Sequence, residues 1–170
     1  MSIATLVLCP PLPGGTATID TPELTDAILD HMDGRNVSVI SPTIPAAEPN
    51  DDLRTQHAHW VAYLAVALSK ANAVSPVMLV LSGTNGPLVT ALGFSQRASR
   101  RAVGGYVLVE ADIPSAQSRI NDWPDAPVFY VASPTADPDA CMQARLRGWT
   151  IIEVPDLSAP VVSAALANLL

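Results

Sequence analysis

The sequence predicts a single α/β domain, a three-layer αβα arrangement in which helices cover both faces of a mostly parallel sheet. Apolar, β-rich runs alternate with helical patterns along the chain, which is typical of βαβ units. These runs show little in–out alternation, as expected for strands that are covered on both faces. With 170 residues, of which 49% are hydrophobic and 15% charged, the chain can form one buried core, so we assign residues 1–170 to one domain.

Strands and helices are predicted from the spacing of apolar residues and from the turn residues between them. The six expected strands are Ala4 to Cys9, Val37 to Ser41, Val77 to Ser82, Val103 to Ala111, Ala126 to Ser133 and Trp149 to Val154. The expected helices cover residues 22–33, 54–72, 87–101, 114–121, 138–147 and 159–170. A right-handed βαβ arrangement places the functional edge at the carboxyl ends of the strands.

The third strand leads into a glycine-flanked turn, Ser82-Gly83-Thr84-Asn85-Gly86-Pro87, which is followed by a helical pattern. In a nucleophile elbow, G-x-S-x-G, such a strand-to-helix turn exposes one serine beside free backbone amides. Small residues are present here at both ends of the pattern, but Gly83 stands where the serine is expected. The turn therefore indicates an elbow without a clear nucleophile.

Several segments together resemble a small bacterial branch of the α/β-hydrolase fold. They are Gly86-Pro87 in the elbow, Val103 to Pro114, Trp123 to Tyr130 and Arg147-Gly148-Trp149, so the resemblance covers almost the whole chain. It implies an esterase-like ancestry, a minimal α/β-hydrolase-like sheet with strand order 2-1-3-4-5-6, and a cap between the fourth and fifth strands. That interval is only Pro114 to Asp125, which indicates a cap-deleted member. The resemblance also implies a histidine after the last strand, but residues 154–160 contain none, so the triad is interpreted as degenerate.

Two alignments of the elbow remain open. Without a gap, Gly83 occupies the reactive position, whereas a slip of one residue presents Thr84 in a Ser82-x-Thr84-x-Gly86 frame. We favour Gly83, because the elbow residue adopts a positive φ that glycine accepts freely and a β-branched residue does not. Asn85 or Gly86 would then cap the helix, with Pro87 at its first position. The expected result is a cluster of unpaired amide donors that could bind an oxyanion or a carboxylate.

Few other polar residues are expected at the carboxyl edge of the sheet. His57 falls near the start of the second long helix, on one helical face with Trp60, and packing in the core is the plain alternative to catalysis. Glu110 and Asp112 end the fourth strand, where two carboxylates could do acid–base work or could simply be solvated. The candidate catalytic residues are His57, Glu110, Thr84 and Ser82, and the candidate ligand-binding residues are Leu12, Gly83, Asn85, Asp112 and Asp156.

Composition excludes several classes of partner. A formal net charge of −7 argues against nucleic acid and anionic membranes, which need clustered Lys and Arg. The three histidines and two cysteines have no metal spacing and the glycines no dinucleotide-binding spacing, so we expect no metal and no cofactor. Cys9 and Cys141 are expected as free buried thiols. No signal or membrane-spanning stretch is recognisable, and a cytoplasmic location is expected.

Three functions remain open. The first is a non-hydrolytic step in small-molecule or peptide tailoring, in which the elbow amides hold a carbonyl while His57 or Glu110 moves a proton. The second is a pseudoenzyme that binds a ligand or another protein, and the third is a weak esterase that uses Ser82 or Thr84. Loss of the cap is expected to expose an apolar floor near Leu12, Leu81, Ile113 and Leu157, which favours a homodimer or a partner complex.

Overall fold

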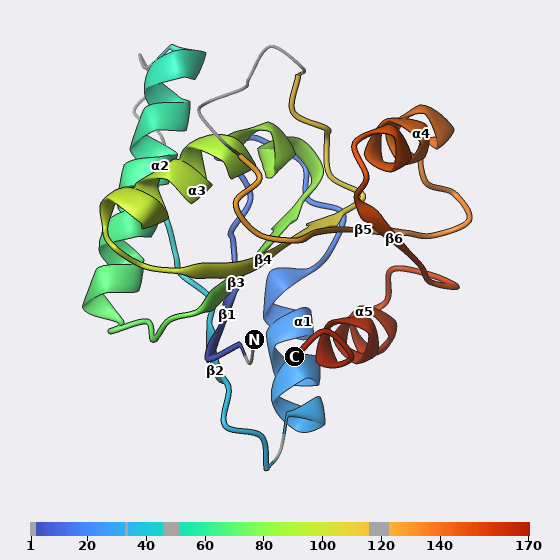
Figure 1. Cartoon of the computed structure of the whole chain (residues 1–170), viewed down its shortest axis with the longest axis horizontal. Coiled ribbons are helices and arrows are strands. Elements are labelled where there is room, and N and C mark those ends of the chain that lie inside the picture. Colours follow the sequence, from blue (N-terminus) through green and yellow to red (C-terminus); the bar gives the residue numbers. More distant parts are fainter. Residues whose placement is uncertain (1–2, 33, 46–51, 116–122) are drawn as a thin grey trace.

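A computed structural model describes residues 3–32, 34–45, 52–115 and 123–170. Its centre is a six-stranded sheet in the order β2-β1-β3-β4-β5-β6, with every neighbouring pair parallel (Figure 1). The strands are β1 (Thr5–Leu8), β2 (Ser38–Ile40), β3 (Val77–Ser82), β4 (Val103–Val109), β5 (Val128–Ala132) and β6 (Thr150–Glu153). The predicted strand order and parallel direction are confirmed.

In the described part of the chain, five α-helices cover the two faces of the sheet. They are α1 (Thr21–His31), α2 (Leu53–Lys70), α3 (Val89–Ala98), α4 (Pro138–Leu146) and α5 (Ala159–Ala167). Helices α1 and α5 lie on one face, and α2, α3 and α4 lie on the other (Figure 1). Asp20 begins α1 by accepting a hydrogen bond from the Glu23 amide, and Asp52 does the same for α2 with Thr55.

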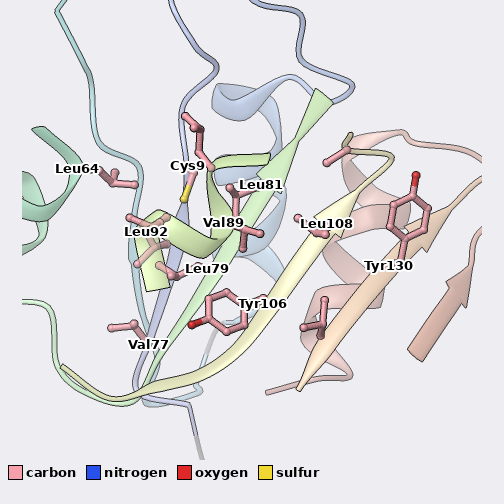
Figure 2. Packing of buried hydrophobic residues seen from close by; sticks show 14 of the residues in the cluster. Cys9, Leu64, Val77, Leu79, Leu81, Val89, Leu92, Tyr106, Leu108 and Tyr130 are labelled. Atoms are coloured by element: carbon pink, nitrogen blue, oxygen red, sulfur yellow. The ribbon is translucent and has the colours of Figure 1, made fainter. Parts of the chain in front are cut away.

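The core consists of two apolar layers separated by the sheet. Every residue of β3 is buried, and successive side chains point to opposite layers, as the two-residue period of a strand requires. Leu79 and Leu81 pack with α2 and α3, whereas Met78 and Val80 pack with α1 and α5. Figure 2 shows the first of these layers. Burial on both faces explains why the apolar runs lack alternation.

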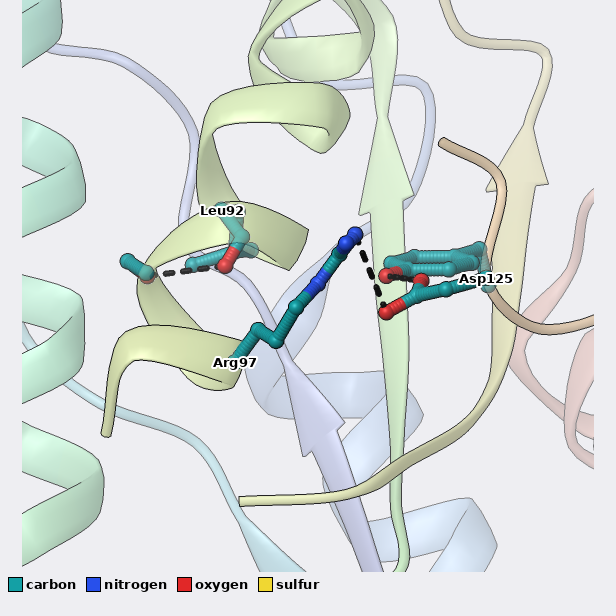
Figure 3. A network of polar contacts seen from close by, with 5 residues as sticks. Leu92, Arg97 and Asp125 are labelled. Atoms are coloured by element: carbon teal, nitrogen blue, oxygen red, sulfur yellow. Dashed lines mark hydrogen bonds and ion pairs between the residues drawn. The ribbon is translucent and has the colours of Figure 1, made fainter. Parts of the chain in front are cut away.

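A polar network ties α3 to β4 and to the segment that leads into β5 (Figure 3). The Tyr106 hydroxyl donates to Asp125 Oδ1 at 2.6 Å, and Arg97 lies 3.4 Å from Asp125 Oδ2. Asp125 thereby accepts the hydrogen bond of the buried Tyr106 hydroxyl at the amino-terminal edge of the sheet, away from the elbow.

The structure corrects two local expectations. A short 3-10 helix, η1 (Gly83–Leu88), connects β3 to α3, so Pro87 lies inside η1 and α3 begins only at Val89. Strand β4 ends at Val109 instead of Ala111, and Glu110 has a φ of 41°. Most of the helix predicted for residues 114–121 lies outside the described residues.

Two findings concern the chain as a whole. Cys9 and Cys141 are both free thiols, Cys9 buried and Cys141 half-buried. Within the described ranges, the helices are too short or too polar to cross a lipid bilayer.

Candidate functional site

The elbow begins at Ser82, the last residue of β3, and Gly83 is the first residue after the strand. Its φ of 58° lies in the left-handed region, which confirms the conformation expected for Gly83. Gly83 is buried, and its carbonyl accepts a hydrogen bond from the Asp112 amide at 2.9 Å. The turn is therefore attached to the segment after β4.

The elbow is covered by residues 9–20 between β1 and α1, which we call the covering loop. The backbone amide of Thr84 donates to the Thr16 carbonyl at 3.1 Å, and the Thr84 hydroxyl lies 3.3 Å from the same oxygen. Further along the loop, the Thr18 hydroxyl donates to the Val109 carbonyl at 2.6 Å. The loop thus crosses the carboxyl ends of β3 and β4.

The covering loop approaches Gly83 so closely that no side chain fits there. A Cβ built on Gly83 would overlap the Thr16 carbonyl oxygen and lie 2.9 Å from the Thr16 carbonyl carbon. In α/β-hydrolases, the amide after the nucleophile forms part of the oxyanion hole. Here the corresponding amide, that of Thr84, is already bonded within the chain, so the expectation of unpaired donors is wrong for this residue.

Asn85 joins the elbow to the end of β1. Its side chain is fully buried, Oδ1 accepts from the Ser82 amide at 2.9 Å, and Nδ2 donates to the Pro10 carbonyl at 3.0 Å. The indole of Trp60 donates to the same Pro10 carbonyl at 3.2 Å. Ser82 is 2% exposed. Both Ser82 and Asn85 therefore lie beneath the surface, with Asn85 holding the turn together.

Leu12 belongs to the covering loop and packs inward. Leu12 is 9% exposed and Leu81 is fully buried, so the expected bare apolar floor is absent at these two positions. Ile113 and Leu157 are half-buried. The reason is the covering loop, which folds over the end of β3 in the place where the sequence suggested open space.

Glu110 and Asp112 line a cavity of about 290 Å³ beside the elbow. Its walls come from the end of β4, from β5 and from α4: Glu110, Ala111, Asp112, Ile113, Tyr130, Asp137, Ala140 and Gln143. Glu110 Oε1 accepts a hydrogen bond from the Ser133 amide at 2.8 Å, which holds the carboxylate next to the carboxyl end of β5. Asp137 caps α4 by accepting from the Asp139 amide at 3.0 Å.

The structure separates the remaining candidates from this cavity. Asp156 lines a second cavity of about 340 Å³, together with Ser133 and Thr135, and accepts from the Ser158 amide at 2.8 Å. These hydrogen bonds from Ser158 hold the pKa of Asp156 below its ordinary value. His57 is half-buried on α2 and borders neither cavity. The candidate residues therefore lie in four places instead of one site: the elbow, the two cavities and α2.

Sequence reasoning missed Thr16 and Tyr130 as parts of this edge. Tyr130 is 1% exposed and borders the first cavity. Burial raises the pKa of its phenol to about 12, with further contributions from Cys141 and from the negative charges of Glu110, Asp137 and Asp112. A tyrosine in the middle of the otherwise apolar run Val128–Ala132 was the available signal.

The raised phenol pKa values predict an alkaline transition. Tyr130 should stay protonated up to about pH 12, and burial also raises the pKa of Tyr106. The unfolded chain ionises near pH 10, so the stabilising contribution is present below about pH 10 and is lost as the pH rises toward the folded value. In an alkaline titration, phenolate absorbance should rise for Tyr130 only near pH 12, and this rise should be missing in Tyr130→Phe. Circular dichroism recorded at the same pH values shows whether the chain is still folded. A wild-type trace that matches Tyr130→Phe up to unfolding would contradict this assignment.

No group of three or more His, Cys, Asp or Glu side chains suited to a metal ion occurs among the residues with described positions.

Comparison with known proteins supports the fold alone. No family model matches the sequence, and no curated protein is significantly similar to it. The structure is similar to that of a protein from Xanthomonas campestris assigned to the α/β hydrolase superfamily, with a TM-score of 0.67, 15% identity, and coverage of 98% of this chain and 97% of that one. It is also similar to RedJ, a thioesterase of the prodiginine pathway in Streptomyces coelicolor, with a TM-score of 0.62, 14% identity, and coverage of 99% and 91%. A third similar structure is the Vlm2 thioesterase domain, with a TM-score of 0.61, 15% identity, and coverage of 99% and 91%.

Proposed function

We propose that this chain, which has an α/β-hydrolase-like fold, is a non-hydrolytic protein that binds a small molecule or peptide. The observation that carries the proposal is the bond from the Thr84 amide to the Thr16 carbonyl. It occupies the donor that an acyl-transfer enzyme needs for its oxyanion. The overlap of a Cβ at Gly83 with the same carbonyl supports the absence of a nucleophile at the elbow.

The weak-esterase alternative has less support from the geometry. Ser82 is 2% exposed, and the Thr84 hydroxyl lies within hydrogen-bond distance of the Thr16 carbonyl. A nucleophilic hydroxyl needs a base within about 3.2 Å and an open path to the substrate. Of the candidate bases, His57 lines neither cavity, and Asp156 lines only the second one.

A non-hydrolytic proton transfer is the second candidate, and Glu110 favours it. Its φ of 41° is unusual for a residue with a side chain, and such strain is concentrated at functional positions. The Ser133 amide orients its carboxylate beside the cavity. In this version Glu110 moves the proton, and the elbow amide of Thr84 holds no substrate oxygen.

The proposal is tested by labelling with a fluorophosphonate and by turnover of a short-chain aryl ester. We expect no stoichiometric labelling, and a turnover rate equal to that of Thr84→Val, because neither hydroxyl is activated. An active serine esterase treated in parallel shows that the reagents work. Labelling that disappears in Thr84→Val or Ser82→Ala would overturn the proposal and favour the esterase.

A further inference from the structure

The cavity beside the elbow has the charge pattern of a site for a cation. Three of its eight lining residues are acidic, namely Glu110, Asp112 and Asp137. None of the described residues that line it is Lys or Arg. Because like charges repel an anion and attract a cation, the electrostatic field in this cavity favours a positively charged occupant.

Tyr130 provides an independent indication of a ligand. The residue is 1% exposed, yet it borders the cavity, and Figure 2 shows its hydroxyl directed away from the aliphatic side chains of the cluster. Within the described part of the chain, the Tyr130 hydroxyl has no hydrogen-bond partner. Among the described residues, the fully buried side-chain polar atom without a partner is Trp123 Nε1, so the Tyr130 oxygen is open to the cavity and available to a group that enters it.

The size and lining of the cavity limit what the cation can be. A metal ion is disfavoured, since the described carboxylates form no metal-binding group. The volume of about 290 Å³ lies at the lower end of the range for small-molecule pockets. Ala111, Ile113 and Ala140 supply apolar walls beside the acidic groups. This combination suits a positive head group on a short hydrocarbon stem.

We propose that this cavity binds a small primary amine in its ammonium form. The carboxylates of Asp112, Asp137 and Glu110 in its lining supply the negative charge, and the Tyr130 hydroxyl accepts one N–H. The hydrocarbon stem lies against Ala111, Ile113 and Ala140. This assignment rests on the proposed ligand-binding function and names the class of ligand.

The test uses n-butylamine as the probe, with n-butanol and butyrate as neutral and anionic probes of similar size. Binding is followed by two-dimensional NMR titration of the whole chain. We expect butylammonium to shift amide signals of residues 110–113 and 137–143 saturably, butanol to bind about tenfold more weakly, and butyrate to leave these signals unchanged. Added salt should weaken the binding of butylammonium and not that of butanol.

Two variants and one matched control locate the site. Asp112→Asn removes a charge from an exposed side chain, and Tyr130→Phe removes only the hydroxyl, so each should weaken butylammonium binding about three- to tenfold. Asp26→Asn removes the same charge from α1 on the opposite face of the sheet and should leave binding unchanged.

Several results would overturn the assignment. They are equal binding of butylamine and butanol, full affinity in both Asp112→Asn and Tyr130→Phe, or an equal loss in Asp26→Asn, which would indicate non-specific attraction. The proposed function fails by a different measurement, the labelling of Thr84 or Ser82 by the fluorophosphonate. The two failures are therefore distinguishable.

Discussion

Gly83→Ala is expected to destabilise the protein by about 2 to 4 kcal/mol. A left-handed backbone costs a residue with a side chain roughly 1 kcal/mol, and the new methyl group would also overlap the Thr16 carbonyl. Relief of that overlap requires the covering loop to move, which breaks the bond between the Thr84 amide and Thr16. Overpacking against backbone typically adds about 1 to 3 kcal/mol. Gly83→Ser carries the same overlap.

Gly148→Ala is the matched control for this substitution. Gly148 has a φ of 73°, but a Cβ there would meet nothing within 4 Å. Chemical denaturation of both variants separates the conformational cost, which they share, from the overlap, which only Gly83→Ala has. Equal losses of unfolding free energy would mean that the covering loop gives way freely, and the elbow could then open to a substrate.

Asn85→Ala is expected to cost about 3 kcal/mol. The substitution removes both hydrogen bonds of a fully buried amide and leaves the Ser82 amide and the Pro10 carbonyl without this partner. Each buried polar group left unsatisfied costs about 1 to 3 kcal/mol. Urea denaturation at neutral pH measures the loss. A change below about 1 kcal/mol would show that the elbow does not depend on this side chain.

Asn85→Asp is expected to lower the free energy of unfolding by an amount that depends on pH. In this variant one carboxylate oxygen still accepts from the Ser82 amide. The other oxygen replaces Nδ2, which in the wild type donates to the Pro10 carbonyl at 3.0 Å, so two oxygens now face each other. Only a protonated carboxyl can donate there, and burial also raises its pKa above the ordinary value of about 4. The variant should therefore approach wild-type stability below about pH 4 and fall behind as the pH rises. A constant difference between pH 4 and pH 7 would contradict this reasoning.

Much of the fold is contained in local sequence patterns. The apolar run Val77–Ser82 is long, bounded by turn residues and β-branched at both valines, and β3 has these same bounds. Asp20 and Asp52 precede the predicted helices, and the structure shows that their carboxylates cap α1 and α2. Boundaries were less predictable, because β4 ends where Glu110 adopts a positive φ that the sequence gives no reason to expect.

The candidate site was only partly predictable. The conformation of Gly83 follows from its place between a strand and a turn, which is a local property. The partner of that turn is not local, since Thr16 lies 68 residues before Thr84 and the two meet through backbone atoms that every residue carries. No side-chain pattern could reveal that a carbonyl fills the space expected for an oxyanion.

Periodicity predicted the parallel sheet, and the strand order followed from the resemblance to α/β-hydrolases. The glycine at position 83 is read directly from the sequence, because it is the identity of a single residue. Three features became visible in the three-dimensional structure alone: the covering loop closes the elbow, Asp156 and Glu110 border different cavities, and Tyr130 borders the cavity of Glu110 and Asp112. The physical reason is that such contacts depend on how loops and helices pack over the strand ends, and those distances are set by the whole core.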